Sequence, residues 1–426
     1  MMKVFRFCIY TLIFSLSACT DTAKTSPETH VAPHIVILIA DDLGLKRAPC
    51  YAQNSPMRFL SRQCDKAVVF ERAYTHPYCT ASRAAMMTAR HTFRHGAGDV
   101  RAEATKLPLT ETTLPEALKQ GGAKNYRFSA FGKWHLADDG NGDVNNPNLQ
   151  GFDNFEGNPR QHHTYSYFNY DWYKNGTFVG NIPTYKTTKI TDTIIDDFKS
   201  HAGQGPQFYW TGFVSPHMPY HTPPENLHHH TELPKGFIWQ PVRKRPPNTD
   251  EFTINKRDPR LDPYFMAMLE ALDHEIERLV THLSAQSDRP IVFVFLGDNG
   301  TSAEVYPGDR SIGYRAKTQL YDGGTRIPFM IWSTDNQAVG FRRGRVKAMV
   351  HLVDLLPTIA DITHAKPIYP KAIDGQSFYK VLTSSIEPTQ HTRDYIYLEL
   401  GNLAKLPFSY GAVNRDGLKL ILREKQ

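Results

Sequence analysis

The sequence contains no internal repeat and no low-complexity stretch, and its N-terminal apolar run is short. That run, from Phe7 to Leu16, cannot cross a bilayer permanently, because a spanning helix needs about 20 apolar residues. Disorder is excluded as well, since 40% of the 426 residues are hydrophobic and 12% are aromatic. Such a chain buries one large core, or a large core and a small one.

A strong net charge is also lacking. The formal net charge is only +6, and we expect no nucleic-acid partner. Two local basic clusters, at residues 243–245 and 342–345, suit an anionic substrate. A solvated basic surface is the more common role of such clusters.

The N-terminus has the features of an export signal. Lys3 and Arg6 precede the apolar run, as in a secretory signal. The run ends in Leu16-Ser17-Ala18-Cys19, which is similar to the bacterial lipobox, in which the cysteine is acylated. We expect residues 1–19 to be a lipoprotein signal peptide, with a plain signal peptide as the alternative, and residues 20–32 to be a flexible tether. The mature protein would then be anchored through lipid at Cys19 on the periplasmic or outer face of a Gram-negative membrane.

Cysteine is scarce, with five residues in the whole chain. Cys8 lies in the removed segment and Cys19 is the lipidation candidate, so Cys50, Cys64 and Cys79 remain. Three is an odd number in an oxidising compartment. Cys50 and Cys64 could pair, although the sequence leaves the pairing open. Cys79 would then be a thiol without a partner.

Apolar, β-branched or aromatic runs predict four buried strands, at His34–Ala40, Phe128–Phe131, Phe208–Val214 and Ile291–Leu296. Helical patterns lie between them, notably at Thr113–Gln120 and Asp262–Leu283. Strands that alternate with helices predict an α/β fold with a mostly parallel central sheet and helices on both faces. We expect residues 33–330 to form this α/β domain.

A different pattern follows Pro328. Met349–Ile362 reads as a helix, Asp394–Leu400 as a strand, and Ala412–Leu422 as a hairpin that turns at Arg415-Asp416-Gly417. We therefore expect residues 331–426 to form a small C-terminal α+β subdomain with antiparallel strands.

Polar side chains directly follow each of the four predicted strands. They are Asp41 and Asp42, Lys133 and His135, His217, and Asp298 and Asn299. Ligands bind outside the carboxyl ends of the strands in such a sheet, so we expect one site there. Lys133 and His135 alternate on one extended segment and should face the same way. His217 lies in a proline-flanked turn, where a lone histidine is more often structural.

The acidic pairs suggest a metal site. Asp41 and Asp42 would repel each other in a strand-end crevice unless a cation or an arginine balanced them. An isolated Asp-Asp pair more often caps a helix, but Asp298 and Asn299 add oxygen ligands at another strand end. Oxygen ligands without Cys or clustered His favour calcium or magnesium over zinc. We interpret residues 228–230, three histidines in a proline-rich stretch, as a solvated loop.

The segment Cys79-Thr80-Ala81-Ser82-Arg83, followed by Met87-Thr88-Ala89-Arg90, resembles the signature of type I, formylglycine-dependent sulfatases. In this alkaline-phosphatase-like family, a cysteine, a proline or alanine two positions later and an arginine four positions later direct oxidation of the cysteine to formylglycine (3-oxoalanine). Ala89 stands where the family usually has glycine. The modified residue would begin a helix, whose N-terminus favours an anion. The alternative is an ordinary buried cysteine beside a helix.

The resemblance runs in order from about His34 to about Leu422, through the segments 132–136, 215–219, 313–317 and 321–328. It implies a sulfatase-maturating enzyme as partner and a cation, calcium or alternatively magnesium, whose ligands are Asp41, Asp42, Asp298, Asn299 and modified Cys79. Arg83, Lys133 and Lys317 would bind the negative charge of the sulfate. His217, with Lys317, would protonate the leaving oxygen. His135 would take the proton of the second hydroxyl of the hydrated formylglycine.

The substrate is less defined than the chemistry. Export and the aromatic-rich stretch Tyr165–Tyr173 favour a sulfated carbohydrate, with aryl sulfates as model substrates. Arg160, His162 and His163 are candidates for sugar contact, with an ordinary polar loop as the alternative. Two other functions stay open: a phosphodiesterase or phosphonate monoester hydrolase of the same superfamily, and a carbohydrate-binding lipoprotein whose Cys79 is never modified.

Overall fold

The structure, a computed structural model, describes residues 31–98, 106–160, 166–238, 259–307, 315–383, 393–402 and 405–423. Residues Ala32–Gln426 form one compact unit. The predicted signal peptide, Cys19, residues 20–30 of the tether, His162 and His163 lie outside the described residues. Within the described ranges, the structure contains no helix with the length and apolar character needed to cross a membrane.

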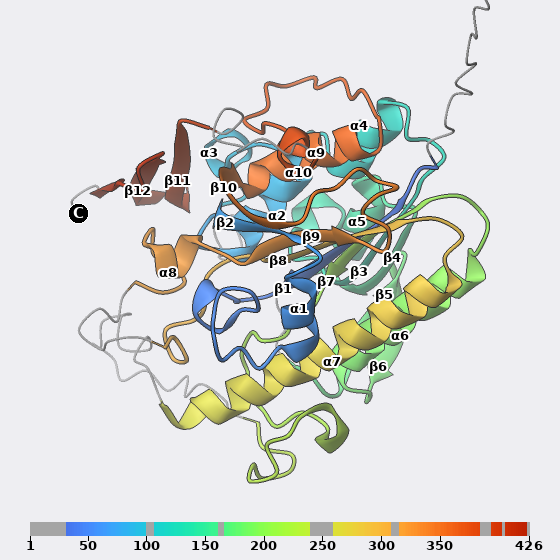
Figure 1. Cartoon of the computed structure of the whole chain (residues 1–426), viewed down its shortest axis with the longest axis vertical. Helices are drawn as coiled ribbons and strands as arrows, with labels where there is room; N and C mark the ends of the chain where they lie inside the picture. Colours follow the sequence, from blue (N-terminus) through green and yellow to red (C-terminus); the bar gives the residue numbers. More distant parts are fainter. Residues whose placement is uncertain are drawn as a thin grey trace, which may run out of the picture. The chain divides into compact units, whose positions relative to one another are not determined.

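A ten-stranded sheet forms the centre of the unit, in the order β10-β2-β9-β8-β1-β7-β3-β4-β5-β6 (Figure 1). Its strands are β1 (His34–Ala40), β2 (Val68–Tyr74), β3 (Arg127–Lys133), β4 (Asn154–Asn158), β5 (Tyr170–Lys174), β6 (Thr177–Ile182), β7 (Gln207–Gly212), β8 (Ile291–Gly297), β9 (Phe329–Ser333) and β10 (Gly344–His351). Strands β8, β1, β7, β3 and β4 run parallel, as do β2 and β10, whereas β9, β5 and β6 form antiparallel pairs with their neighbours. The predicted mostly parallel sheet is confirmed.

Helices cover both faces of this sheet, as predicted (Figure 1). The α-helices are α1 (Arg58–Gln63), α2 (Cys79–Thr88), α3 (Thr92–His95), α4 (Leu114–Gln120), α5 (Asn146–Leu149), α6 (Lys186–Ser200), α7 (Asp262–Gln286), α8 (Asp322–Thr325), α9 (Leu355–Ile362) and α10 (Tyr379–Thr383). Short 3₁₀ turns are η1 (Leu45–Arg47), η3 (Asp139–Asn141), η4 (Asp143–Asn145), η6 (Glu225–Leu227), η8 (Pro259–Leu261) and η10 (Leu352–Asp354).

Strand β1 explains why two layers of helices are needed. Successive side chains of a strand point to opposite faces. Ile35, Ile37 and Ile39 pack in the core that contains α2, α4, α9 and α10. Val36 and Leu38 pack in the opposite core, with α6 and α7. Because all these side chains are fully buried, β1 lies in the centre of the sheet, between the two layers of helices.

The C-terminal part differs from the prediction in two ways. Residues 349–351, expected in a helix, belong to β10, which pairs in parallel with β2, and α9 starts only at Leu355. His351 causes the change of direction: its Nδ1 accepts the Val353 N–H at 3.2 Å, and its own N–H donates to Asp354 at 2.9 Å. The predicted boundary at residue 330 also falls inside β9, a strand of the central sheet.

The second sheet is smaller than the C-terminal subdomain that we predicted for residues 331–426. It consists of β11 (Tyr395–Asn402), β12 (Lys405–Asn414) and β13 (Lys419–Arg423), all antiparallel. The predicted strand at 394–400 and the hairpin with its turn at 415–417 are confirmed. Ile396 and Leu398 pack against Met349 of β10, so this sheet rests on the edge of the central one.

Cys50 and Cys64 form a disulfide. Cys79 is the free cysteine among the described residues, and it is buried. The pairing that the sequence left open is therefore settled in favour of an unpaired Cys79.

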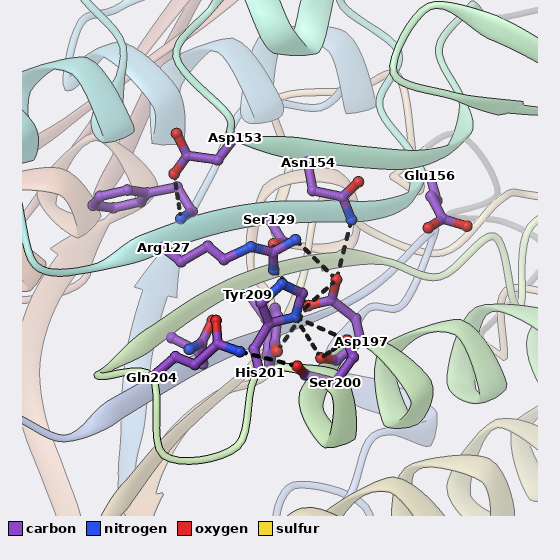
Figure 2. A network of polar contacts seen from close by, with 12 residues as sticks. Arg127, Ser129, Asp153, Asn154, Glu156, Asp197, Ser200, His201, Gln204 and Tyr209 are labelled. Carbon is purple, nitrogen blue, oxygen red and sulfur yellow. Dashed lines mark hydrogen bonds and ion pairs between the residues drawn. The ribbon is translucent and has the colours of Figure 1, made fainter.

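A polar network holds the amino ends of β3 and β7 to α6 (Figure 2). The Asp197 carboxylate accepts bonds from Arg127 at 2.7 and 3.0 Å, from the Tyr209 hydroxyl at 3.0 Å and from Asn154 at 3.3 Å. The network lies at the edge of the sheet opposite the carboxyl ends of these strands. We therefore assign it a structural role.

Replacing Asp197 with alanine should lower the free energy of unfolding by about 2–4 kcal/mol, because Arg127 keeps a largely buried charge without its partner. Urea denaturation followed by circular dichroism measures this loss. Asp197→Asn keeps the shape of the side chain and should lower the free energy of unfolding by less than Asp197→Ala does. A loss below about 1 kcal/mol for Asp197→Ala would contradict the structural role.

Candidate active site

Cys79 is the first residue of α2 and is 1% exposed. The signature residue Ser82 fixes this helix start: its hydroxyl donates to the His76 carbonyl at 3.0 Å and accepts from the Thr75 hydroxyl at 2.6 Å. The helix ends at Thr88, and its C-cap residue Ala89 has a φ of 57°. A left-handed C-terminal residue favours glycine, which gives a physical reason for the glycine usual at this position.

The predicted metal ligands at the ends of β1 and β8 lie side by side because these two strands are neighbours in the sheet. They are Asp41, Asp42, Asp298 and Asn299. Ala40 at the end of β1 is in register with Gly297 at the end of β8. The backbone N–H of Asp42 donates to Asp298 at 3.2 Å, and the Asn299 amide donates to Asp42 at 2.8 Å. Together with Asp41, these side chains are at most 1% exposed.

Each buried carboxylate has one cationic partner. Lys133 lies 2.5 Å from Asp41, and Lys317 lies 2.5 Å from Asp42. The Arg83 guanidinium binds Asp298 at 2.9 and 3.0 Å. Arg83 Nη1 also donates to the Lys133 carbonyl at 2.7 Å, whereas its buried Nη2, 2.9 Å from the Asp298 carboxylate, has no hydrogen-bond partner among the described residues. Arg83 therefore positions Asp298, and its contact with the sulfate stays a prediction.

Burial and the neighbouring positive charges have opposite effects on the pKa values of the acidic groups in this cluster. Burial alone would raise the pKa of Asp41, but Lys133 holds that pKa well below its usual range. Burial and the neighbouring charge of Asp41 raise the pKa of Asp298 to about 7. Burial also raises the pKa of the Cys79 thiol, despite the nearby Lys133 and Lys317. An unmodified Cys79 is therefore uncharged near neutral pH and a poor nucleophile.

The cluster fits a hard divalent cation. Asp41 Oδ1 and Asn299 Oδ1 are buried oxygens without a hydrogen-bond partner among the described residues. Ligand atoms of Asp41, Cys79 and Asp298 lie within 4.8 Å of one another, where the Cys79 sulfur stands in for an oxygen of the modified residue. Calcium and magnesium take such oxygen ligands. A bound cation would also favour the charged form of Asp298.

Both predicted histidines lie beside these charges. His217 Nδ1 bonds to the Met218 carbonyl at 2.6 Å, which leaves Nε2, 3.9 Å from Asp42, toward the site. Burial, then Lys133, lowers the pKa of His135 far below its usual value, and its two ring nitrogens have no hydrogen-bond partner in the described structure. His135 has a φ of 69°, so the extended segment that we predicted ends at Lys133.

Arg160 does not join this cluster through any contact that we observe. It forms ion pairs with Asp139 and Asp143, so its role in sugar binding stays a prediction. Ser302 was not among the predicted site residues, and its hydroxyl donates to Asp42 at 2.9 Å. Its place three residues after Asn299, in the same strand-end segment, is the signal that could have identified it.

A second group of metal-capable side chains joins His76, His91 and His351, which come from distant segments. The Nδ1 of His351 accepts the Val353 N–H, so the proton of the neutral ring is on Nε2. That nitrogen has no lone pair to offer a metal. Since the three rings also contact one another edge to face, at 4.8–5.3 Å, we assign them to packing.

A mostly parallel sheet with acidic and basic groups and a free cysteine at its carboxyl edge defines an alkaline-phosphatase-like protein. Residues 33–365 match the Sulfatase family, and the chain belongs to that family. Arylsulfatase J of Mus musculus is 23% identical over 398 aligned residues, which cover 87% of this chain and 60% of that protein. N-acetylgalactosamine-6-sulfatase of Rattus norvegicus is 26% identical over 393, covering 84% and 67%. The chain thus spans about two thirds or less of these relatives.

Solved structures share the fold. They include Ps i-CgsB in complex with k-i-k-neocarrahexaose (TM-score 0.70, 21% identity, 89% of this chain and 82% of that chain). BT4656 in complex with D-glucosamine-2-N,6-O-disulfate has a TM-score of 0.68, 18% identity and coverage of 92% and 88%. The phosphonate monoester hydrolase SpPMH from Silicibacter pomeroyi has a TM-score of 0.62, 19% identity and coverage of 92% and 89%. At these identities the likeness establishes the fold.

Proposed function

We propose that the protein hydrolyses sulfate monoesters, with Cys79 converted to formylglycine as its nucleophile. The position of Cys79 carries the proposal: it begins α2, and its sulfur lies 3.9 Å from the ammonium of Lys317 beside three paired carboxylates. A sulfate ester carries negative charge on its oxygens, so the site must neutralise it. The helix N-terminus and Lys317 supply positive charge at residue 79.

The cation would be calcium, or alternatively magnesium, held by Asp41, Asp42, Asp298 and Asn299. When bound, it would supply charge that polarises the sulfate oxygens. Arg83 keeps Asp298 oriented, and Lys133 does the same for Asp41.

The reaction needs three proton transfers. One hydroxyl of the hydrated formylglycine would attack sulfur and give its proton to the buried Asp298 carboxylate, whose raised pKa suits a base. His217 would protonate the leaving alcohol through Nε2 from its imidazolium form, which the neighbouring Asp42 favours against the effect of burial on its pKa, and residue 79 would then carry the sulfate as an ester. His135 then takes the proton of the second hydroxyl. The C–O bond to sulfate breaks, sulfate leaves, and the aldehyde forms again and adds water. Burial keeps His135 neutral and therefore able to act as this base.

For the substrate we propose a sulfated carbohydrate. A relative is named N-acetylgalactosamine-6-sulfatase, and BT4656 was solved with a sulfated glucosamine. Phosphonate monoester hydrolysis is the second candidate, since SpPMH shares the fold. We also propose that residues 1–19 direct export and that Cys19 carries the lipid anchor, on the strength of the N-terminal sequence. Detergent partitioning of the wild type and of Cys19→Ala tests the anchor.

The first experiment is mass spectrometry of the tryptic peptide Ala73–Arg83 from protein made together with a sulfatase-maturating enzyme. Conversion of CH₂SH to CHO should reduce its mass by about 18 Da relative to the cysteine form. The same sample is then assayed on an aryl sulfate and an aryl phosphate diester at equal concentrations. We expect the sulfate to react faster. A faster phosphate diester would favour the second candidate, and an unmodified thiol beside a correctly matured control sulfatase would contradict the proposal.

A further inference from the structure

A cavity of about 490 Å³ lies between Phe168 and the loop 222–236, which follows the active-site turn of His217. This volume is within the range of small-molecule binding sites. The loop is drawn in yellow-green beside the start of α7 in Figure 1. Its two ends are held together by a bridge between His221 and Ile238. None of the residues that we assign to the reaction is among the described lining residues of this cavity.

The walls combine apolar surface with polar edges. Phe168, Pro223 and Leu233 supply the apolar part, and Thr222, His228 and His230 supply polar groups. Among the described lining residues, the charged side chains Glu225 and Lys235 pair with each other at 2.6 Å. The cavity therefore offers no unbalanced positive charge to a sulfate group. An aromatic ring beside hydroxyl and imidazole groups suits an uncharged sugar ring, which has an apolar face and polar edges.

Contacts connect this cavity to the group that we assign as the acid. Tyr167 is the neighbour of Phe168, and its hydroxyl donates to the His217 carbonyl at 2.7 Å. The His221 ring packs on both Tyr167, at 4.1 Å, and Phe168, at 5.7 Å. Backbone and side-chain lengths then place Phe168 within roughly 15 Å of His217. With His217 assigned to the leaving oxygen, the rest of a carbohydrate substrate would extend from the sulfated ring on this side.

We propose that this cavity binds an uncharged sugar unit of an oligosaccharide substrate, one or two units from the sulfated ring, with Phe168 as its stacking surface. The inference rests on the proposed sulfatase function and deepens it. If the cavity binds a second sugar unit, the preferred substrate is an oligosaccharide. The Ps i-CgsB structure, with its bound neocarrahexaose, is an example of this fold with a longer ligand.

The kinetic test compares Phe168→Ala with the matched control Phe178→Ala. Phe178 is an exposed aromatic residue of β6, outside the described lining of the cavity. The substrates are an aryl sulfate, a sulfated monosaccharide, and a panel of hexasaccharides from sulfated galactans and glycosaminoglycans. For hexasaccharides that the wild type hydrolyses, Phe168→Ala should raise KM about tenfold with little change in kcat. Neither variant should change turnover of the two small substrates.

A loss of aryl sulfate turnover in Phe168→Ala equal to the loss on hexasaccharides would overturn the inference, because Phe168 would then only support the His217 turn. Binding separates this outcome from failure of the sulfatase function. Saturation-transfer NMR of the Cys79→Ala protein with desulfated hexasaccharides should show contact that Phe168→Ala removes and Phe178→Ala keeps. No contact with any member of the desulfated panel would refute the sugar site, whatever the enzyme does to aryl sulfates.

Discussion

Cys79→Ala will lower kcat/KM for an aryl sulfate by about 10⁴-fold or more, because it removes the group that attacks sulfur. The side chain is buried at the start of α2, so the loss of one sulfur atom should cost about 1 kcal/mol of stability and leave the fold intact. Thermal unfolding followed by circular dichroism controls for this. Full turnover by Cys79→Ala would refute the role of residue 79.

Cys79→Ser gives the sharper test of the two-hydroxyl mechanism. A serine that stays unmodified can attack sulfur once, but it has no second hydroxyl from which His135 could remove a proton. We expect one turnover per molecule and a peptide about 80 Da heavier, the mass of an added sulfuryl group. The same variant should release its product in a burst, followed by a negligible steady rate. Repeated turnover by an unmodified serine would contradict the elimination step.

The central sheet could be predicted from the sequence because fully buried parallel strands are continuous apolar runs. His34–Ala40 became β1 without a shift at either end. The run of residues 349–362 misled us because apolar residues continue through β10 into α9. Only the hydrogen bonds of His351 with Val353 and Asp354 separate the strand from the helix, and sequence periodicity does not show them.

The placement of the candidate site followed from one rule, that the carboxyl ends of parallel strands meet at the same edge. In agreement with this rule, the Asn299 amide nitrogen lies 2.8 Å from the Asp42 carboxylate although the two residues are 257 positions apart in the sequence. The rule does not predict which cationic side chain pairs with which carboxylate. Arg83 pairs with Asp298, and we did not predict that pairing from the sequence. The choice among three carboxylates depends on side-chain reach, which a linear sequence does not contain.

Removal of the divalent cation should have the second-largest effect. The three carboxylates at Asp41, Asp42 and Asp298 are balanced by three protein cations, so the fold itself does not require a metal. Binding of the sulfate does require the metal. The sulfate adds negative charge to a site in which Lys133, Lys317 and Arg83 are already paired with carboxylates. We therefore expect a chelator to reduce aryl sulfate turnover by at least about 10²-fold while the melting temperature changes little, and added calcium to restore the rate.

Asp41→Ala should show the same loss without rescue by calcium, because it removes a ligand oxygen and leaves Lys133 without its partner. The matched control is Ser302→Ala, which deletes one hydrogen bond to Asp42 but no charged ligand. It should reduce turnover by less than about tenfold and respond to calcium as the wild type does. If chelator-treated protein, shown by elemental analysis to be free of divalent metals, kept its full rate, the carboxylates of residues 41, 42 and 298 would serve only to pair Lys133, Lys317 and Arg83.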